Sequence, residues 1–171
     1  LETSDSTLWV ASLHYLLKVN IQKRKNELEV KDIKRYEFDR DNRGQRFNQI
    51  FSIKQENDSI IWLGMRGSGA IRFNYITGNY NLISFEEKGI APMNDVLSIC
   101  ISKNGNKWFG SSYGITKVKE LPNGEFDYQN FNERDGLPNN TIHGILENHE
   151  GKLWLSTNAG VVLFDPEENT F

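Results

Sequence analysis

Few side chains in this 171-residue chain are of the types that perform covalent catalysis or bind transition metals. The histidines are His14, His143 and His149, and the single cysteine, Cys100, lies within the apolar run VLSICIS. A thiol in such surroundings is typically buried and unreactive, and one cysteine allows neither an internal disulfide nor a multi-cysteine metal site. The sequence contains no HExxH, Gly-x-Ser-x-Gly or phosphate-loop motif. We therefore expect no catalytic residue, cofactor or metal site.

Aromatic, arginine and asparagine side chains instead form a pattern that suits ligand binding. They recur in the turns that follow tryptophan-containing segments and in the loops that lead into the next repeat. Aromatic rings stack on the apolar faces of sugars, and Arg and Asn side chains hydrogen-bond sugar hydroxyls. The alternative is that each is an ordinary polar loop residue. The candidates are His14, Tyr15, Arg66, Tyr113 and Asn158 from the turns, with Arg46, Asn94, Arg134, Asp135, Asn139 and Asn140 from the loops.

An internal repeat supplies the elements that would position these residues. The four tryptophans, Trp9, Trp62, Trp108 and Trp154, follow one another at intervals of 53, 46 and 46 residues. The phrases around them are similar: TLWVASLHYLLKV, IIWLGMRGSGAIRF, NKWFGSSYGITKV and KLWLSTNAGVVLF. A period of this length is typical of β-propeller blades.

Two columns of small residues accompany the tryptophans, and we interpret both as structural. Two positions after each Trp stand Ala11, Gly64, Gly110 and Ser156, which indicates that a neighbouring segment packs across that point. A second column predicts tight turns that need a positive φ angle. Its members are Gly69, Gly114 and Gly160, with Tyr15 in the first copy.

The connecting segments complete a set of four strands in each repeat. RFNQIFSIKQENDS, MNDVLSICISKNGN and NNTIHGILENHEGK align without gaps and have apolar residues on both faces, as a strand buried between blades requires. Each repeat then has an inner strand, the Trp strand, a strand after the glycine turn and a half-exposed outer strand. We interpret residues 21–34 as an extended hairpin rather than a helix, because they have neither a cap nor a clear apolar stripe.

The predicted fold is therefore all-β, a single β-propeller segment of about four four-stranded antiparallel blades spanning residues 1–171. The approximate blades are 1–39, 47–85, 94–131 and 140–171. The sequence begins with Leu1 rather than Met, and we expect it to be an incomplete segment of a larger propeller. On this interpretation the first blade lacks its inner strand and the last lacks its outer strand. Unpaired edges of this kind recruit partners, so we expect self-association.

Charge and hydropathy argue against two classes of partner. Twenty basic and 23 acidic residues give a formal charge of -3, so the chain shows no basic surface for nucleic acid or anionic lipid. The densest basic stretch, residues 21–35, is interrupted by three acidic residues and is typical of a solvated face. No window approaches the ~18 to 20 apolar residues of a membrane span, so we expect no membrane insertion by this segment.

The phrases KWFGSSYGITKV and ERDGLPNNTIHGILENHEGKLWLSTNAGVVLFDP resemble the two-component regulator propeller repeat. The resemblance covers essentially the whole chain and is weakest in the first copy, where Ala11 and Tyr15 replace glycines. It implies the periplasmic sensor region of a hybrid two-component system with histidine kinase and response regulator parts. It also implies that the stimulus is commonly a breakdown product of a complex carbohydrate. No binding residue is implied, because the family's sites vary between receptors.

Three functional hypotheses follow. The leading one is a non-catalytic, ligand-sensing segment of a periplasmic receptor that responds to carbohydrate and joins the remaining blades of its parent protein. The main alternative is a lyase or glycosidase on the same fold. A lyase that resembles these repeats uses histidines and a divalent ion, which makes His14 and His143 its candidates, although a lone strand histidine is more often structural. The third hypothesis is a structural or dimerisation scaffold.

Overall fold

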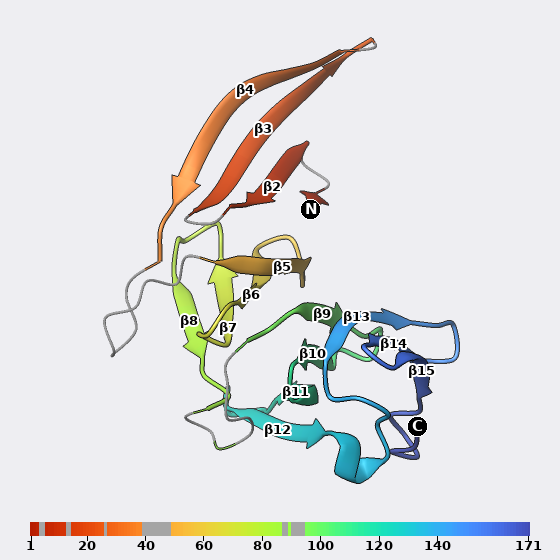
Figure 1. Ribbon diagram of the computed structural model, residues 1–171. Coiled ribbons are helices and arrows are strands. Elements are labelled where there is room, and N and C mark those ends of the chain that lie inside the picture. Colours follow the sequence, from red (N-terminus) through yellow and green to blue (C-terminus); the bar gives the residue numbers. More distant parts are fainter. Residues whose placement is uncertain (4–5, 13–14, 26, 39–48, 87–88, 90–94) are drawn as a thin grey trace.

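The computed structural model describes residues 1–3, 6–12, 15–25, 27–38, 49–86, 89 and 95–171, which form four antiparallel sheets in chain order (Figure 1). We call these sheets the first to fourth blades. The first blade contains β1 (Glu2–Thr3), β2 (Thr7–Ala11), β3 (Leu16–Arg24) and β4 (Glu27–Tyr36). The second contains β5 (Ile50–Gln55), β6 (Ile60–Met65), β7 (Ala70–Asn74) and β8 (Tyr80–Ile83). The third contains β9 (Ser98–Ile101), β10 (Lys107–Ser111), β11 (Gly114–Glu120) and β12 (Phe126–Phe131). A short 3-10 helix, η1 (Glu133–Asp135), leads into the fourth, which contains β13 (Ile142–Glu147), β14 (Leu153–Thr157) and β15 (Gly160–Phe164).

The blades meet along their inner strands, because β5 contacts β9 and β9 contacts β13. Each four-stranded blade then runs outward in the order inner strand, Trp strand, third strand and outer strand. This arrangement confirms the all-β fold of propeller blades predicted from the repeat. In the described part of the chain, no helix has the length and apolar character needed to cross a bilayer.

The first blade differs from its prediction. Its inner position is occupied by β1, which pairs with β2 in the register Glu2↔Leu8 and Thr3↔Thr7. The backbone N–H of Trp9 also donates to the carbonyl of Leu1 at 2.7 Å. The prediction that this blade lacks an inner strand is therefore wrong. Two residues are enough to fill the position, and two residues are too few to show an alternating pattern in the sequence.

The β3–β4 hairpin agrees with the sequence. Residues 21–24 lie in β3 and residues 27–34 in β4, which confirms the extended hairpin in place of a helix. The fourth blade has three strands in the structure, and β15 is followed by a turn in which Asp165 and Thr170 pair.

The core consists of interfaces between successive blades, and a buried tryptophan lies at each. Trp9 packs edge-on against Phe73 of the second blade, with the ring centroids 6.3 Å apart. Trp62 packs against Phe109 of the third blade at 5.3 Å, and Trp108 against Phe164 of the fourth at 5.7 Å. The corresponding Trp154 is 44% exposed, since no further sheet of the structure covers its face.

The small residues of the Trp strands lie where the next blade's inner strand approaches most closely. A Cβ atom on Gly64 would lie 2.7 Å from Val96, and one on Gly110 would lie 2.7 Å from Ile142.

The turn glycine Gly114 is restricted by its own blade. It has a φ of 102°, and a Cβ there would lie 2.0 Å from the carbonyl oxygen of Phe131. Only glycine fits these three backbones without displacement of a neighbour.

One buried ionic cluster joins the second and third blades. The Glu56 carboxylate accepts a hydrogen bond from Trp62 Nε1 at 2.7 Å and lies 3.1 Å from Lys107 Nζ and 3.4 Å from Arg72 Nε. The Lys107 side chain is only 7% exposed. Burial raises the pKa of Glu56, but the hydrogen bonds from Trp62 and Lys107 and the two cationic charges outweigh it, so the pKa lies below its ordinary value. The cluster therefore holds a carboxylate in its charged form between two blades.

Candidate ligand-binding face

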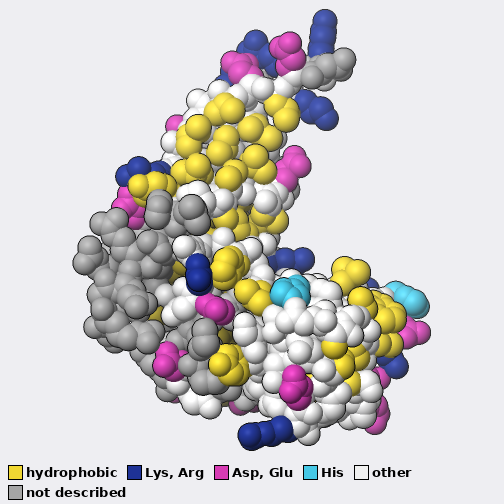
Figure 2. Space-filling model, in the orientation of Figure 1, with side chains coloured by type: hydrophobic (Ala, Val, Ile, Leu, Met, Phe, Trp, Pro, Cys, Tyr) yellow, Lys and Arg dark blue, Asp and Glu magenta, His cyan; other side chains and the backbone are white. Residues whose placement is uncertain are grey.

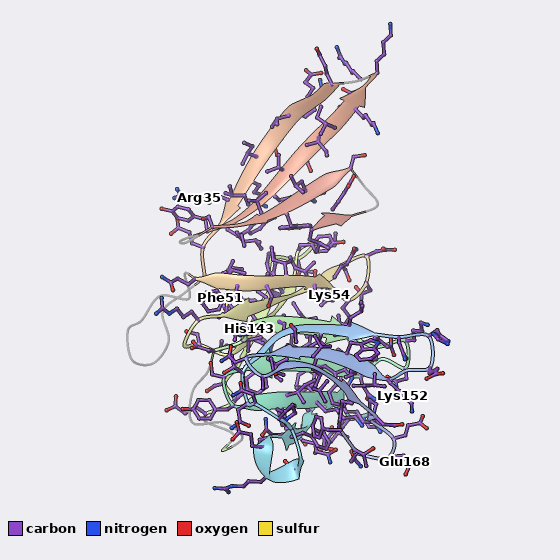
Figure 3. The ribbon with its side chains drawn as sticks, turned by 45° about the vertical axis from the view of Figure 1, so that its right-hand side comes forward. Arg35, Phe51, Lys54, His143, Lys152 and Glu168 are labelled. Atoms are coloured by element: carbon purple, nitrogen blue, oxygen red, sulfur yellow. The ribbon has the colours of Figure 1, made fainter. Side chains whose placement is uncertain are left out.

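One side of the molecule collects the turns between the second and third strands of the blades and the starts of the inner strands. We call it the turn face, and its turns are residues 66–69, 112–113 and 158–159. The inner strands all begin on this side because every blade repeats the same antiparallel order. Figure 3 shows Phe51 and His143 toward this end of β5 and β13, whereas Lys54 lies toward the other end.

Two of the inner strands, β5 and β13, open with a β-bulge that exposes one side chain. In β5 the pairing passes from Ile50↔Met65 to Ser52↔Gly64, so Phe51 is the extra residue. In β13 the extra residue is His143, at the same position of its repeat. Phe51 is 47% exposed, and His143 is exposed as well. Bulges of this kind redirect a side chain and are common beside functional sites.

Arg66 is held firmly in its turn on the turn face. Its backbone N–H donates to the Gln49 carbonyl at 2.9 Å, and its guanidinium Nη1 donates to Gln49 Oε1 at 3.0 Å. The next residue, Gly67, has a φ of 70° and donates its N–H to Asp95 Oδ1 at 2.6 Å. Because Asp95 leads into the third blade, this turn is tied both to its own blade and to the next. The exposed guanidinium keeps further N–H donors available to a ligand.

His143 and Asn158 form the polar pair of the fourth blade. His143 Nε2 lies 2.7 Å from Asn158 Oδ1, and both side chains are exposed. The Asn158 amide nitrogen can still donate to a ligand, and the second ring nitrogen of His143 can donate or accept according to its tautomer.

A comparison with protein families identifies the repeat. Residues 136–159 match the family model described as the two-component regulator propeller. Histidine kinase P4 of Formosa agariphila is 25% identical over 166 residues, an alignment that covers 69% of this chain and 12% of that protein. The chain thus corresponds to a small part of that relative.

Solved structures share the propeller fold at low sequence identity. The extracellular domain of the hybrid two component system BT3049 of B. thetaiotaomicron superposes with a TM-score of 0.74 at 19% identity, over 99% of this chain and 23% of that one. The WD40 β-propeller domain of Doa1 superposes with a TM-score of 0.65 at 13% identity, over 99% and 50%. Enzymes also occur among the structures with this fold, so the fold alone does not decide between binding and catalysis.

The blades bring some of the predicted residues together. Arg66 and Asn158 both lie in turns of the turn face. Tyr113 lies in the equivalent turn of the third blade, half-buried against the core between the second and third blades. Its backbone N–H is fixed by Ser111 Oγ at 2.9 Å. These three residues therefore belong to corresponding turns of three consecutive blades.

Tyr15 lies in the equivalent turn of the first blade, between β2 and β3, where its ring stacks against the Arg35 guanidinium at 4.1 Å. Arg134 is exposed on η1, which Figure 1 shows beside the end of β12, apart from the inner strands. His14, Arg46 and Asn94 lie outside the described residues.

Sequence reasoning missed Phe51, Gln49 and Asp95 as parts of the turn face, and it considered His143 only as a catalytic or structural residue. The signal that could have identified Phe51 and His143 is their shared position at the start of two aligned inner strands. Among the residues that the structure describes, no three His, Cys, Asp or Glu side chains form a group that could hold a metal ion.

Proposed function

We propose that this chain is a non-catalytic, ligand-binding part of the extracytoplasmic sensor region of a two-component histidine kinase, and that its ligand is a saccharide. The turn face is the observation that supports this function. It combines an exposed aromatic ring, Phe51, with the hydrogen-bonding groups of Arg66, His143 and Asn158. The match to the regulator propeller model and the similarity to a histidine kinase support the receptor context.

The chemistry of the turn face fits a sugar better than an apolar or a strongly charged ligand. A sugar ring has an apolar face that can stack on Phe51, and its hydroxyls require directional donors and acceptors. The guanidinium of Arg66 is oriented by Gln49, and the His143 ring by Asn158. Groups that are already oriented lose little conformational entropy on binding, which favours recognition of small ligands.

Binding measurements on the chain test this proposal. Isothermal titration with a panel of neutral and acidic oligosaccharides should find at least one that binds. Phe51→Ala and Arg66→Ala should each weaken that binding by about fivefold or more, because each removes a stacking or hydrogen-bonding contact of roughly 1 to 3 kcal/mol. Ile76→Ala is the matched control, since Ile76 is 69% exposed in the β7–β8 turn and lies away from this face. Binding that neither substitution changes would contradict the assignment of this face.

The intact receptor provides a second test for Tyr113. Tyr113→Ala should shift the dose response to the inducing saccharide while the folded state is retained. An unaltered dose response in both Tyr113→Ala and Arg66→Ala would place the ligand on other blades of the receptor.

An enzymatic function predicts a different result with the same saccharides. Incubation of the chain with each oligosaccharide, with and without a divalent metal, should leave the oligosaccharide intact. Metal-dependent product formation that is lost in His143→Ala would overturn the non-catalytic proposal.

A further inference from the structure

The β3–β4 hairpin extends well beyond the body of the first blade. β3 has 9 residues and β4 has 10, whereas β7 and β8 have 5 and 4 and β11 and β12 have 7 and 6. Pairing of β2 with β3 ends at Thr7↔Asn20, so the part beyond Asn20 is a ribbon of only two strands (Figure 1). Two-stranded ribbons are marginally stable in water unless another surface covers them.

One face of this ribbon is apolar. The pairing between β3 and β4 shifts from Asn20↔Asp32 to Ile21↔Val30, so Lys31 is an extra residue of β4. As a result Leu28, Val30 and Ile33 share the face that points away from the second blade. They are 67%, 55% and 57% exposed. Figure 2 shows hydrophobic side chains gathered over this hairpin, with charged side chains at its tip.

β4 is also the outer strand of its sheet, and its sequence is complementary to itself. In an antiparallel pair of two β4 strands related by a two-fold axis between Lys31 and Asp32, Lys31 lies opposite Asp32 of the other copy. Glu29 then lies opposite Lys34, and Val30 opposite Ile33. Because Lys31 is an extra residue, Val30 lies on the same face of the joined sheet as Ile33 of the other copy, and Glu29 on the same face as Lys34.

Neighbouring registers lack this complementarity. If the axis lies between Val30 and Lys31, Glu29 lies opposite Asp32 of the other copy. If it lies between Asp32 and Ile33, Lys31 lies opposite Lys34. Like charges directly opposite each other destabilise a sheet, whereas opposite charges and apolar pairs stabilise it. The charge pattern of β4 therefore favours one register.

We propose that β4 is the interface through which two copies of this chain pair, as antiparallel edge strands in this register. The paired ribbons form a four-stranded sheet whose apolar face is continuous across the two-fold axis. The partner is a second copy of this chain, and the surface is separate from the turn face. A dimer of this kind would couple two sensor segments through their hairpins.

A charge exchange tests the pairing. Sedimentation equilibrium of the 171-residue chain should show a monomer–dimer equilibrium. Glu29→Lys creates two Lys–Lys contacts across the axis and should raise the dissociation constant by about tenfold or more. The double variant Glu29→Lys with Lys34→Glu restores opposite charges and should restore the dimer. Leu146→Ser, on the exposed face of the fourth blade, is the control and should leave the dimer unchanged.

Disulfide trapping tests the register. The double variant Glu29→Cys with Lys34→Cys should form a covalent dimer under mild oxidation, because residues 29 and 34 are opposite only between copies. Within one strand, five residues separate them by roughly 16 Å, too far for a disulfide. Glu29→Cys with Asp32→Cys reports the neighbouring register and should remain uncoupled. A monomeric chain, a dimer insensitive to Glu29→Lys, or preferential coupling of the 29/32 variant would each overturn the proposal.

Discussion

A single methyl group at Gly110 tests the packing that joins the third blade to the fourth. The Cβ atom of Gly110→Ala would lie 2.3 Å from Ser98 Oγ and 2.7 and 2.9 Å from two atoms of Ile142. Ser98 can rotate its hydroxyl away. Ile142 is fully buried and β-branched, so it has few alternative rotamers and the two blades must separate slightly to admit the methyl group.

The expected cost follows from two opposing effects. Overpacking a well-packed core costs about 1 to 3 kcal/mol. Replacing glycine by alanine also reduces the entropy of the unfolded chain, which offsets about 0.4 to 1 kcal/mol. We therefore expect Gly110→Ala to lower the free energy of unfolding by roughly 1 to 2 kcal/mol, which corresponds to a fall of about 2 to 8 °C in the melting temperature of a domain of this size.

Urea and thermal unfolding, followed by tryptophan fluorescence, measure this change. Gly144→Ala is the matched control, because a Cβ there would approach only the rotatable Ser156 hydroxyl, at 2.9 Å. We expect the control to change stability by less than about 0.5 kcal/mol. Equal effects of the two substitutions, or a stabilised Gly110→Ala, would refute the account of the small column as a contact between blades.

Three further predictions concern the buried ion pair, the glycine turn and the tryptophans. Because the pKa of Glu56 is lowered on folding, the stability it contributes is fully present above about pH 4.5, the ordinary pKa of this carboxyl. This stability is lost as the pH falls through the lower pKa that Glu56 has in the folded protein. The urea midpoint of unfolding should therefore depend less on pH in the acid range in Glu56→Gln than in the unmodified chain. Gly114→Ala should lower the urea midpoint of unfolding more than Gly105→Ala does. Both glycines have a positive φ, but only at Gly114 would the added Cβ meet a carbonyl oxygen, that of Phe131. Trp108→Ala should lower the free energy of unfolding by about 3 to 5 kcal/mol, and Trp154→Ala should lower it clearly less, because Trp108 is buried and Trp154 is not. Equal decreases for the two variants, measured by calorimetry, would contradict this reasoning.

The repeat predicted the blade fold because the same packing constraint acts in each copy. A Cβ atom at Gly64 or Gly110 would lie within 3 Å of Val96 or Ile142 of the next blade, so only very small residues fit there, and the restriction recurs at a fixed interval that can be read from the sequence. The turn at Gly114 is visible for the same reason, since its φ of 102° excludes most side chains. Such constraints are local, so one sequence is enough to detect them.

The features that were missed depend on pairing rather than on residue type. The strand β1 has two residues, and neither shows an alternation. The exposure of Phe51 and His143 comes from bulges, and a shift of one residue in a strand pair leaves no mark on composition. The apolar face of the β3–β4 ribbon was hidden for the same reason, because the extra residue Lys31 interrupts the alternation of Val30 and Ile33.

The bulges at the start of β5 and β13 also bear on how such a receptor can change its ligand. The bulged residue takes no place in the strand register, so its side chain is free of the demands that fix the rest of the blade. Phenylalanine occupies this position in the second blade and histidine in the fourth, while the flanking pairs are equivalent. Substitution there can exchange a stacking surface for a titratable hydrogen-bonding group at little cost to folding. A propeller built in this way can diversify its specificity one blade at a time.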